Sequence, residues 1–426
     1  MKSSFNGINI LILYILIISI KKVTSLLDFN YPSAINLLNR NIFIVEKNGI
    51  LVYDEHLENI IHNYPFNSES DKINTLDQLS KVIIKYKRNY VICLINSKIY
   101  FFDYEGKLLV ETEKLITDAN IYNPTLTPII FNEDNYYYYA IAYFINSSGS
   151  YKLKILYYKI NIIAKSNHYI DQLTIDKREV SYVFFTDTYY FQNQGLSCEY
   201  MEAENKQEDN SLVCFFIFKL DDKLYLSQSF FGITINSLAN KDNDKYEPTY
   251  VEDINTVKQI QSITNIARKN ALVCLLFTNG KINCYKFRFT DDWIGTSEDF
   301  LDKREFNFNC RNALYGMKLN SLLNEPKNTL SCIKSGSTVK GTFFNDNLDS
   351  FDSYEQFTQC DSIYGHSIIQ NNISLFVVSD VICNNYKRCF EPLIGELTEI
   401  QIIPTSQKVD TAFEEEEEKE EKKKKK

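Results

Sequence analysis

A β-hairpin formula that recurs along the chain constrains the fold more than any other feature of the sequence. Residues 271–289 contain two runs of apolar, β-branched and aromatic residues that meet at Asn279-Gly280. Asn-Gly between such runs is typical of a two-residue type I′ turn, because that turn needs a positive φ at both central positions. Similar hairpins are predicted around Asn48-Gly49, Asn96-Ser97-Lys98 and Asp221-Asp222. The chain therefore uses one supersecondary unit repeatedly.

The hairpins recur at the spacing of propeller blades. The first three units start at Ile42, Val91 and Tyr136, so the starts are 49 and 45 residues apart. A period of this length, built of short antiparallel strands, predicts an all-β fold: a β-propeller of about six to seven irregular blades. The later units are predicted at residues 182–230, 271–289, 330–344 and 367–403.

Two β-sandwich domains are the alternative fold, because they also give strands at short intervals. We favour the propeller because sandwich strands do not reproduce one hairpin formula at blade-length intervals. If the propeller is correct, residues 90–95, 211–218 and 271–277 occupy equivalent places in different blades. Finding these strands in one sheet would refute it. The repeat carries no signature that assigns the chain to a named family.

The N-terminus has the pattern of a signal peptide. Lys2 precedes an apolar run from Ile8 to Ile20, and small residues follow up to Ser25. This run is too short to span a bilayer comfortably, so residues 1–25 are predicted to be cleaved, with an uncleaved anchor as the alternative. No later stretch is apolar for long enough to span a membrane. The sequence therefore predicts a protein of the secretory pathway, secreted or extracellular.

The remaining chain divides into a propeller at residues 26–404 and a tail at 405–426. The tail ends in runs of Glu and Lys that cannot form a core, and it is predicted to be a disordered low-complexity segment. Cleavage after Ser25 removes three lysines and no acid, which takes the formal net charge from −9 to −12. That charge argues against nucleic acid or anionic lipid as a partner, since both are bound by positive surfaces.

Ten cysteines, an even number, would meet an oxidising compartment. The favoured bridge joins Cys198 to Cys214, across two strand-like runs of one candidate blade. A further set of bridges, including Cys310 to Cys332, is predicted among the last five cysteines. These five are Cys310, Cys332, Cys360, Cys383 and Cys389.

A shared strand position of three cysteines suggests that some of them serve packing. Cys93, Cys214 and Cys274 each follow Val or Ile in the first strand of a predicted hairpin, where a cysteine can act as a small buried apolar residue. A two-residue turn at Asn279-Gly280 would place Cys284 opposite Leu275 rather than Cys274. A bridge between Cys274 and Cys284 is therefore disfavoured by register.

No catalytic, metal or cofactor site is predicted from the motifs. The four histidines do not have metal-ligand spacing, and no Cys/His pattern suggests zinc. Phosphate-binding, dinucleotide-binding and hydrolase signatures are absent from the sequence. A binding role is therefore favoured over catalysis. The histidines are His56, His62, His168 and His366.

The sequence favours a secreted or surface-associated propeller that acts as a protein- or glycan-binding, adhesion-type module. Sequons at Asn146 and Asn372 predict glycosylation. The acidic loops at 202–210 and 239–253 are candidate contact surfaces, because loops carry function on rigid scaffolds. The first alternative is a secreted propeller-type hydrolase with carboxylates in the central channel. The second is a structural component of a membrane complex, which would need a partner to hold it.

Overall fold

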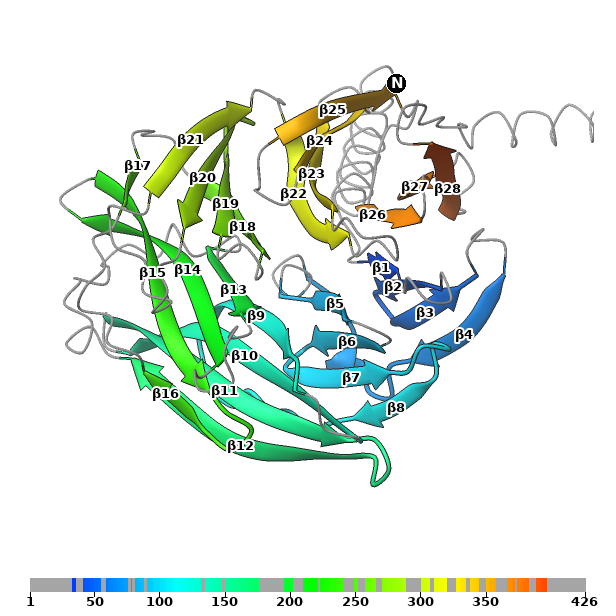
Figure 1. The fold of residues 1–426 in the computed structure, drawn as a ribbon. Coiled ribbons are helices and arrows are strands. Elements are labelled where there is room, and N and C mark those ends of the chain that lie inside the picture. Colours follow the sequence, from blue (N-terminus) through cyan, green and yellow to red (C-terminus); the bar gives the residue numbers. More distant parts are fainter. Residues whose placement is uncertain are drawn as a thin grey trace, which may run out of the picture.

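The described residues of the chain fold into a ring of seven antiparallel sheets (Figure 1). The computed structural model describes residues 33–35, 41–54, 59–75, 78, 81–87, 90–131, 135–147, 150–175, 195–201, 210–220, 223–240, 249–251, 257–265, 270–288, 300–306, 310–319, 327–334, 338–344, 350–357, 366–371, 374–382 and 388–396. Each sheet is built from strands that are consecutive in the sequence, as in a propeller blade. The predicted β-propeller is confirmed, and the described residues form seven blades.

Blades 1 to 4 contain the first 17 strands. Blade 1 consists of β1 (Ser33–Ile35), β2 (Ile42–Glu46), β3 (Gly49–Tyr53) and β4 (Ile60–Pro65). The 3-10 helix η1 (Glu69–Asp71) leads to blade 2, which consists of β5 (Ile83–Lys87), β6 (Tyr90–Ile95), β7 (Lys98–Phe102) and β8 (Leu108–Glu111). Blade 3 consists of β9 (Ile121–Ile129), β10 (Tyr136–Ser147), β11 (Ser150–Asn161) and β12 (Ser166–Ile175). Blade 4 consists of β13 (Leu196–Met201), β14 (Asn210–Leu220), β15 (Lys223–Ile233), β16 (Leu238–Asn240) and β17 (Thr249–Val251).

Blades 5 to 7 contain the other strands of the described residues. Blade 5 consists of β18 (Val257–Asn265), β19 (Asn270–Phe277), β20 (Ile282–Arg288) and β21 (Phe300–Phe306). Blade 6 consists of β22 (Cys310–Leu319), β23 (Lys327–Lys334), β24 (Thr338–Phe344) and β25 (Ser350–Phe357). Blade 7 consists of β26 (His366–Asn371), β27 (Ser374–Ile382) and β28 (Arg388–Glu396).

The first strand of each blade lies at the hub of the ring (Figure 1). Each of these inner strands contacts the inner strand of the next blade, in the order β1, β5, β9, β13, β18, β22 and β26. Strand β26 also contacts β1, so the ring is closed. Closure matters because both faces of each blade are covered by neighbouring blades, whereas a single sheet would expose its faces to solvent.

Burial on both faces explains why the strands are apolar at nearly every position. Alternate residues of β6 belong either to the core shared with blade 1 or to the core shared with blade 3. The residues of β14 divide in the same way between blades 3 and 5. Because successive side chains of a strand point to opposite faces, a blade between two others needs continuous apolar runs.

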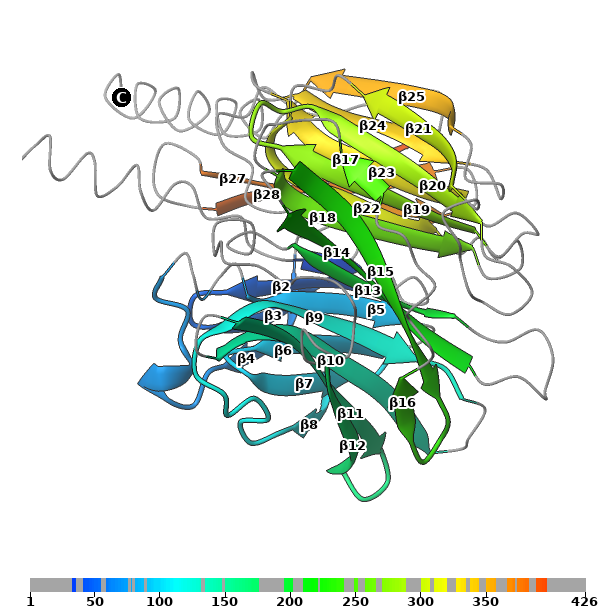
Figure 2. The ribbon, with the colours of Figure 1, turned by 90° about the vertical axis from the view of Figure 1, so that its left-hand side faces the viewer.

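The predicted equivalence of three strands is confirmed. Strands β6, β14 and β19 are each the second strand of a different blade, which rules out a single sheet. The blades nevertheless differ in size. Strands β14 and β15 contain 11 residues each, whereas β6 and β7 contain 6 and 5. Figure 2 shows these long strands of blade 4 from the side.

Two hairpin turns differ in length from the predicted ones. Lys98, predicted as part of a turn, belongs to β7. Asn96 and Ser97 both take a positive φ, of 47° and 69°, and form a two-residue loop between Ile95 and Lys98. In the β19–β20 hairpin only Gly280 has a positive φ, of 84°. Its N–H donates to the carbonyl of Phe277, and the Phe277 N–H donates to the carbonyl of Lys281. This is a three-residue loop ending in a left-handed glycine, not the predicted type I′ turn.

Several predictions lie outside the described residues. They include the signal peptide at 1–25, the first part (182–192) of the unit predicted at 182–230, most of the acidic loops at 202–210 and 239–253, and the tail at 405–426.

Candidate functional site

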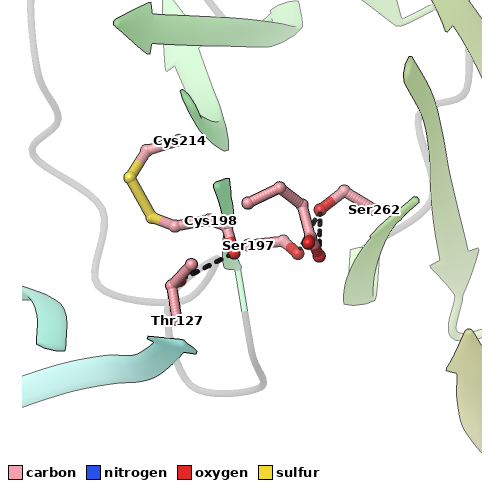
Figure 3. Close-up of a disulfide and its surroundings, with 6 residues drawn as sticks. Thr127, Ser197, Cys198, Cys214 and Ser262 are labelled. Carbon is pink, nitrogen blue, oxygen red and sulfur yellow. Dashed lines mark hydrogen bonds between the residues drawn. A yellow bond between two sulfur atoms is a disulfide. The ribbon is translucent and has the colours of Figure 1, made fainter. Parts of the chain in front are cut away.

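Polar side chains link three neighbouring inner strands at the hub (Figure 3). The Thr127 hydroxyl of β9 donates to the Cys198 carbonyl of β13, at 2.8 Å. On the other side of β13, the hydroxyls of Ser197 and Ser262 lie 2.6 Å apart, and Ser262 belongs to β18. The Ser262 hydroxyl also approaches a carboxylate oxygen of Glu199, at 3.4 Å. Blades 3, 4 and 5 are therefore joined by side-chain hydrogen bonds.

These hub groups are arranged for holding blades together. Thr127, Ser197 and Ser262 are buried, so each hydroxyl would be costly without a partner. A serine nucleophile needs a base within about 2.6–3.2 Å, and the Ser262–Glu199 contact is longer. Within the seven inner strands, Glu199 is the single acidic residue. The chemistry that the arrangement offers is hydrogen bonding between blades.

The predicted bridge between Cys198 and Cys214 is present. The two residues are direct cross-strand partners in β13 and β14, with Cα atoms 4.1 Å apart. Both side chains lie in the core between blades 3 and 4, on the face of the sheet opposite Ser197 and Glu199. The disulfide therefore fastens the innermost strand pair of blade 4, beside the hub hydrogen bonds (Figure 3).

The rejection of a bridge between Cys274 and Cys284 is wrong. A disulfide joins these residues, which are direct partners in β19 and β20. The three-residue loop is the physical reason, because Thr278 on the β19 side joins Asn279 and Gly280 in the loop, and this shift makes Cys274 rather than Leu275 the partner of Cys284. The turn type inferred from Asn-Gly thus led to the wrong register.

Cys93 confirms the packing interpretation for one of the three cysteines. Its thiol is free and buried in the core between blades 1 and 2, and burial raises its pKa. Cys214 and Cys274 are instead bridged, so a shared place in the second strand does not give a shared role. The residue opposite each cysteine decides whether a bridge forms. Opposite Cys93 on β5 lies Ile84, which cannot form one.

The other predicted bridges stay predictions. Cys360 and Cys383 lie outside the described residues. Cys310 and Cys332 fall in neighbouring strands, where their Cα partners are Lys334 and Leu314 respectively. Cys389 lies in β28 opposite Val381.

The histidines are distributed around the ring. His62 belongs to β4 of blade 1, where its ring lies 5.8 Å from that of Tyr64. His168 belongs to β12 of blade 3, and its Nε2 lies 2.8 Å from the Ser166 hydroxyl. His366 begins β26 of blade 7, and His56 lies outside the described residues. In the described part of the chain, no group of three or more potential metal ligands comes together.

An ion pair that the sequence did not reveal joins blade 3 to the segment before it. One oxygen of Asp118 accepts hydrogen bonds from Lys154, at 2.8 Å, and from the Tyr143 hydroxyl, at 2.7 Å. Burial raises the pKa of Asp118, but these two bonds and the lysine charge outweigh it, and the net pKa is lowered. Burial and the Asp118 carboxylate both raise the pKa of Tyr143. The three residues are distant in sequence, so no local motif marks them.

The predicted surface sites are only partly described. Asn146 lies opposite Tyr151 near the tip of the β10–β11 hairpin, where it is partly exposed. Asn372 lies outside the described residues. Among the residues that are described, no helix has the length and apolar character of a membrane span.

No protein-family model and no curated protein matches the sequence. Among solved structures, the chain is similar to the β-propeller domain of Nup133 from Vanderwaltozyma polyspora, with 11% identity and a TM-score of 0.46 over 86% of this chain and 93% of that chain. It is similar to the WD40 domain of SCAP from fission yeast, with 9% identity and a TM-score of 0.38 over 87% and 92%. It is also similar to an α-L-arabinofuranosidase from Fusarium graminearum, with 11% identity and a TM-score of 0.39 over 73% and 90%. These similarities assign no function.

Proposed function

We propose that this chain is a secreted or surface-associated β-propeller that binds a protein or a glycan. Residues 1–25 are a cleaved signal peptide in this proposal, and 405–426 are a charged tail. The two cross-strand disulfides support a secretory route, because such bonds persist in oxidising compartments. The sequon at Asn146 supports it too, since a glycan attached near a hairpin tip would not disturb a core.

The hydrogen bonds that the polar hub residues form between blades are the observation that supports the binding role most. Thr127, Ser197 and Ser262 form hydrogen bonds between blades, and the carboxylate of Glu199 takes part in the same contacts. Groups used in this way hold the ring rigid. A rigid ring presents its loops and strand ends in fixed positions, and such positions carry recognition in many scaffolds.

A secreted hydrolase is the second candidate. Glycoside hydrolysis ordinarily requires two carboxylates that flank the scissile bond. Glu199 is the one acid that the inner strands supply, so a second would have to come from outside these strands. Hydrolysis of a glycoside by the wild-type chain, lost in Glu199→Gln with the melting temperature unchanged, would replace the binding proposal.

Expression of the full chain in a eukaryotic secretory host tests the proposal. The medium should contain a product that begins near Leu26 and carries a glycan removed by peptide N-glycosidase. Asn146→Gln should lose the mass of one glycan, whereas Ser147→Ala should keep it, because the sequon needs Asn146 and Ser148. The purified product should bind a glycan array or intact cells. An intracellular, unprocessed chain would contradict the secretory proposal, and a secreted chain that binds neither would contradict the binding role.

A further inference from the structure

All the inner strands begin on one face of the ring. In a blade of four antiparallel strands, the last strand ends at the level where the first began, so the next blade starts there too. Blade 4 follows this rule, because β16 and β17 both pair antiparallel with β15. We call this face the N-face. The hairpins between the second and third strands of each blade lie on the same face.

Three basic residues begin neighbouring inner strands at the N-face. Lys258 is the second residue of β18, Arg311 is the second of β22, and His366 is the first of β26. Strand β22 contacts both β18 and β26, so these three positions are adjacent around the hub. The chain as a whole is acidic, with a formal net charge of −9. The basic positions are therefore a local departure from the overall charge.

Breaks in strand pairing mark two of these positions independently. The register between β18 and β19 shifts between Val257 and Gln259, which leaves Lys258 without a Cα partner. The register between β22 and β23 shifts between Cys310 and Leu314, and this break includes Arg311. Such bulges are frequent at the rims of closed sheets and beside functional sites, where they alter the direction of a residue. The same two residues thus combine basic charge with interrupted pairing.

The nearby hairpins of blades 5 to 7 add further positive charge. Lys281 is exposed in the loop between β19 and β20. Lys334 ends β23 and Arg388 begins β28, both at the N-face. Each described strand of blades 5 to 7 has one end at the N-face. Among the two residues at that end of each strand, only Glu305 is acidic.

We propose that the N-face of blades 5 to 7 binds an anionic glycan, one that carries sulfate or carboxylate groups. This inference deepens the proposed function and rests on it. Clustered Lys and Arg focus an attractive field on an anion even where the net charge of the protein is negative. Nucleic acid fits less well, because its dense phosphates need a wide positive surface, which this acidic chain does not offer.

The test compares a variant with two reversed charges on the N-face with a variant that has two reversed charges on the opposite face. The probe is a sulfated hexasaccharide, titrated into the secreted full-length chain by calorimetry at two salt concentrations. The double variant Lys258→Glu/Arg311→Glu changes the N-face. The matched control, Lys318→Glu/Lys327→Glu, makes the same charge change where β22 ends and β23 begins, on the opposite face. Melting temperatures within about 2 °C of wild type establish that both variants are folded.

We expect the N-face variant to weaken binding about tenfold or more and to reduce its salt dependence, because two ionic contacts are lost. The control should stay within about twofold. Equal loss in both variants, no loss in the N-face variant, or tighter binding of a single-stranded oligonucleotide would overturn the inference. A chain that binds a neutral glycan or a protein, but not the sulfated probe, would refute the anionic site and leave the proposed function standing. A chain that binds nothing would refute both.

Discussion

Removing the disulfide of blade 4 should destabilise the ring by a calculable amount. Cys198 and Cys214 are 16 residues apart. A cross-link over such a loop lowers the entropy of the unfolded chain, and this raises the free energy of the unfolded chain by about 3 kcal/mol at 25 °C. The double variant Cys198→Ala/Cys214→Ala keeps both Cβ atoms in the core, so loop closure dominates the change. We expect the free energy of unfolding to fall by about 3 kcal/mol.

The matched comparison is the bridge of blade 5. Cys274 and Cys284 are 10 residues apart, so Cys274→Ala/Cys284→Ala should cost about 2.7 kcal/mol, slightly less than the first pair. Urea unfolding under non-reducing conditions, followed by tryptophan and tyrosine fluorescence, measures both values. With an unfolding entropy of about 2.1 cal/mol/K per residue, each loss lowers the melting temperature by about 3 °C.

Two results would refute this reasoning. A loss below about 1 kcal/mol for either pair would mean that the bond does not restrict the unfolded chain as calculated. A non-reducing peptide map that links Cys198 to a cysteine other than Cys214, or Cys274 to one other than Cys284, would show that the strand register is different.

Other perturbations test single features of the ring. Ile84→Cys should form a bridge with Cys93 and raise the free energy of unfolding by about 1 kcal/mol, with Ile84→Ser as the control that cannot; a free thiol at Cys93 in the first variant would contradict the pairing. Gly106→Ala should lower the free energy of unfolding by about 2 kcal/mol in urea, because φ is +84° and the new Cβ would lie 2.8 Å from Val52. An unchanged urea midpoint would argue against this turn. Asp118→Asn should cost roughly 1–2 kcal/mol at pH 7. Because the folded pKa of Asp118 is lowered, that difference should shrink as the pH falls below about 4, and a difference independent of pH would contradict the ion pair.

The sequence was sufficient for the repeat because hairpin turns and apolar runs are local signals. Strands at 90–95 and 98–102 were recognisable from their β-branched and aromatic residues and from the Asn96-Ser97 turn between them. Spacing between such hairpins then indicated blades. The ring follows from the spacing because each blade needs neighbours on both faces.

Register could not be read with the same certainty. A loop of two residues and a loop of three differ by one position, and one position exchanges the partner of every residue in the next strand. Asn279-Gly280 fits either loop, because Gly280 is left-handed in both. The Cys274–Cys284 bridge therefore depended on a detail that the dipeptide alone does not contain.

The hub was hidden for a different reason. Thr127, Ser197 and Ser262 lie in three different blades, and nothing local distinguishes them from other buried hydroxyls. Because inner strands meet only when the ring closes, their contacts are set by blade order. The Asp118 ion pair has the same origin, since Lys154 lies 36 residues further along the chain.

Contact between the first and the last blade tests the closed ring most directly. Photo-crosslinking residues are placed one at a time at Ala34 and Ile35 in β1, because successive side chains of a strand point to opposite faces. On irradiation and mass spectrometry, the two variants together should give peptides joined to β5 and to β26, the two inner strands that β1 contacts along the ring. Variants that melt near the wild-type temperature yet crosslink to β13 or β18, or of which neither crosslinks to β26, would contradict the propeller.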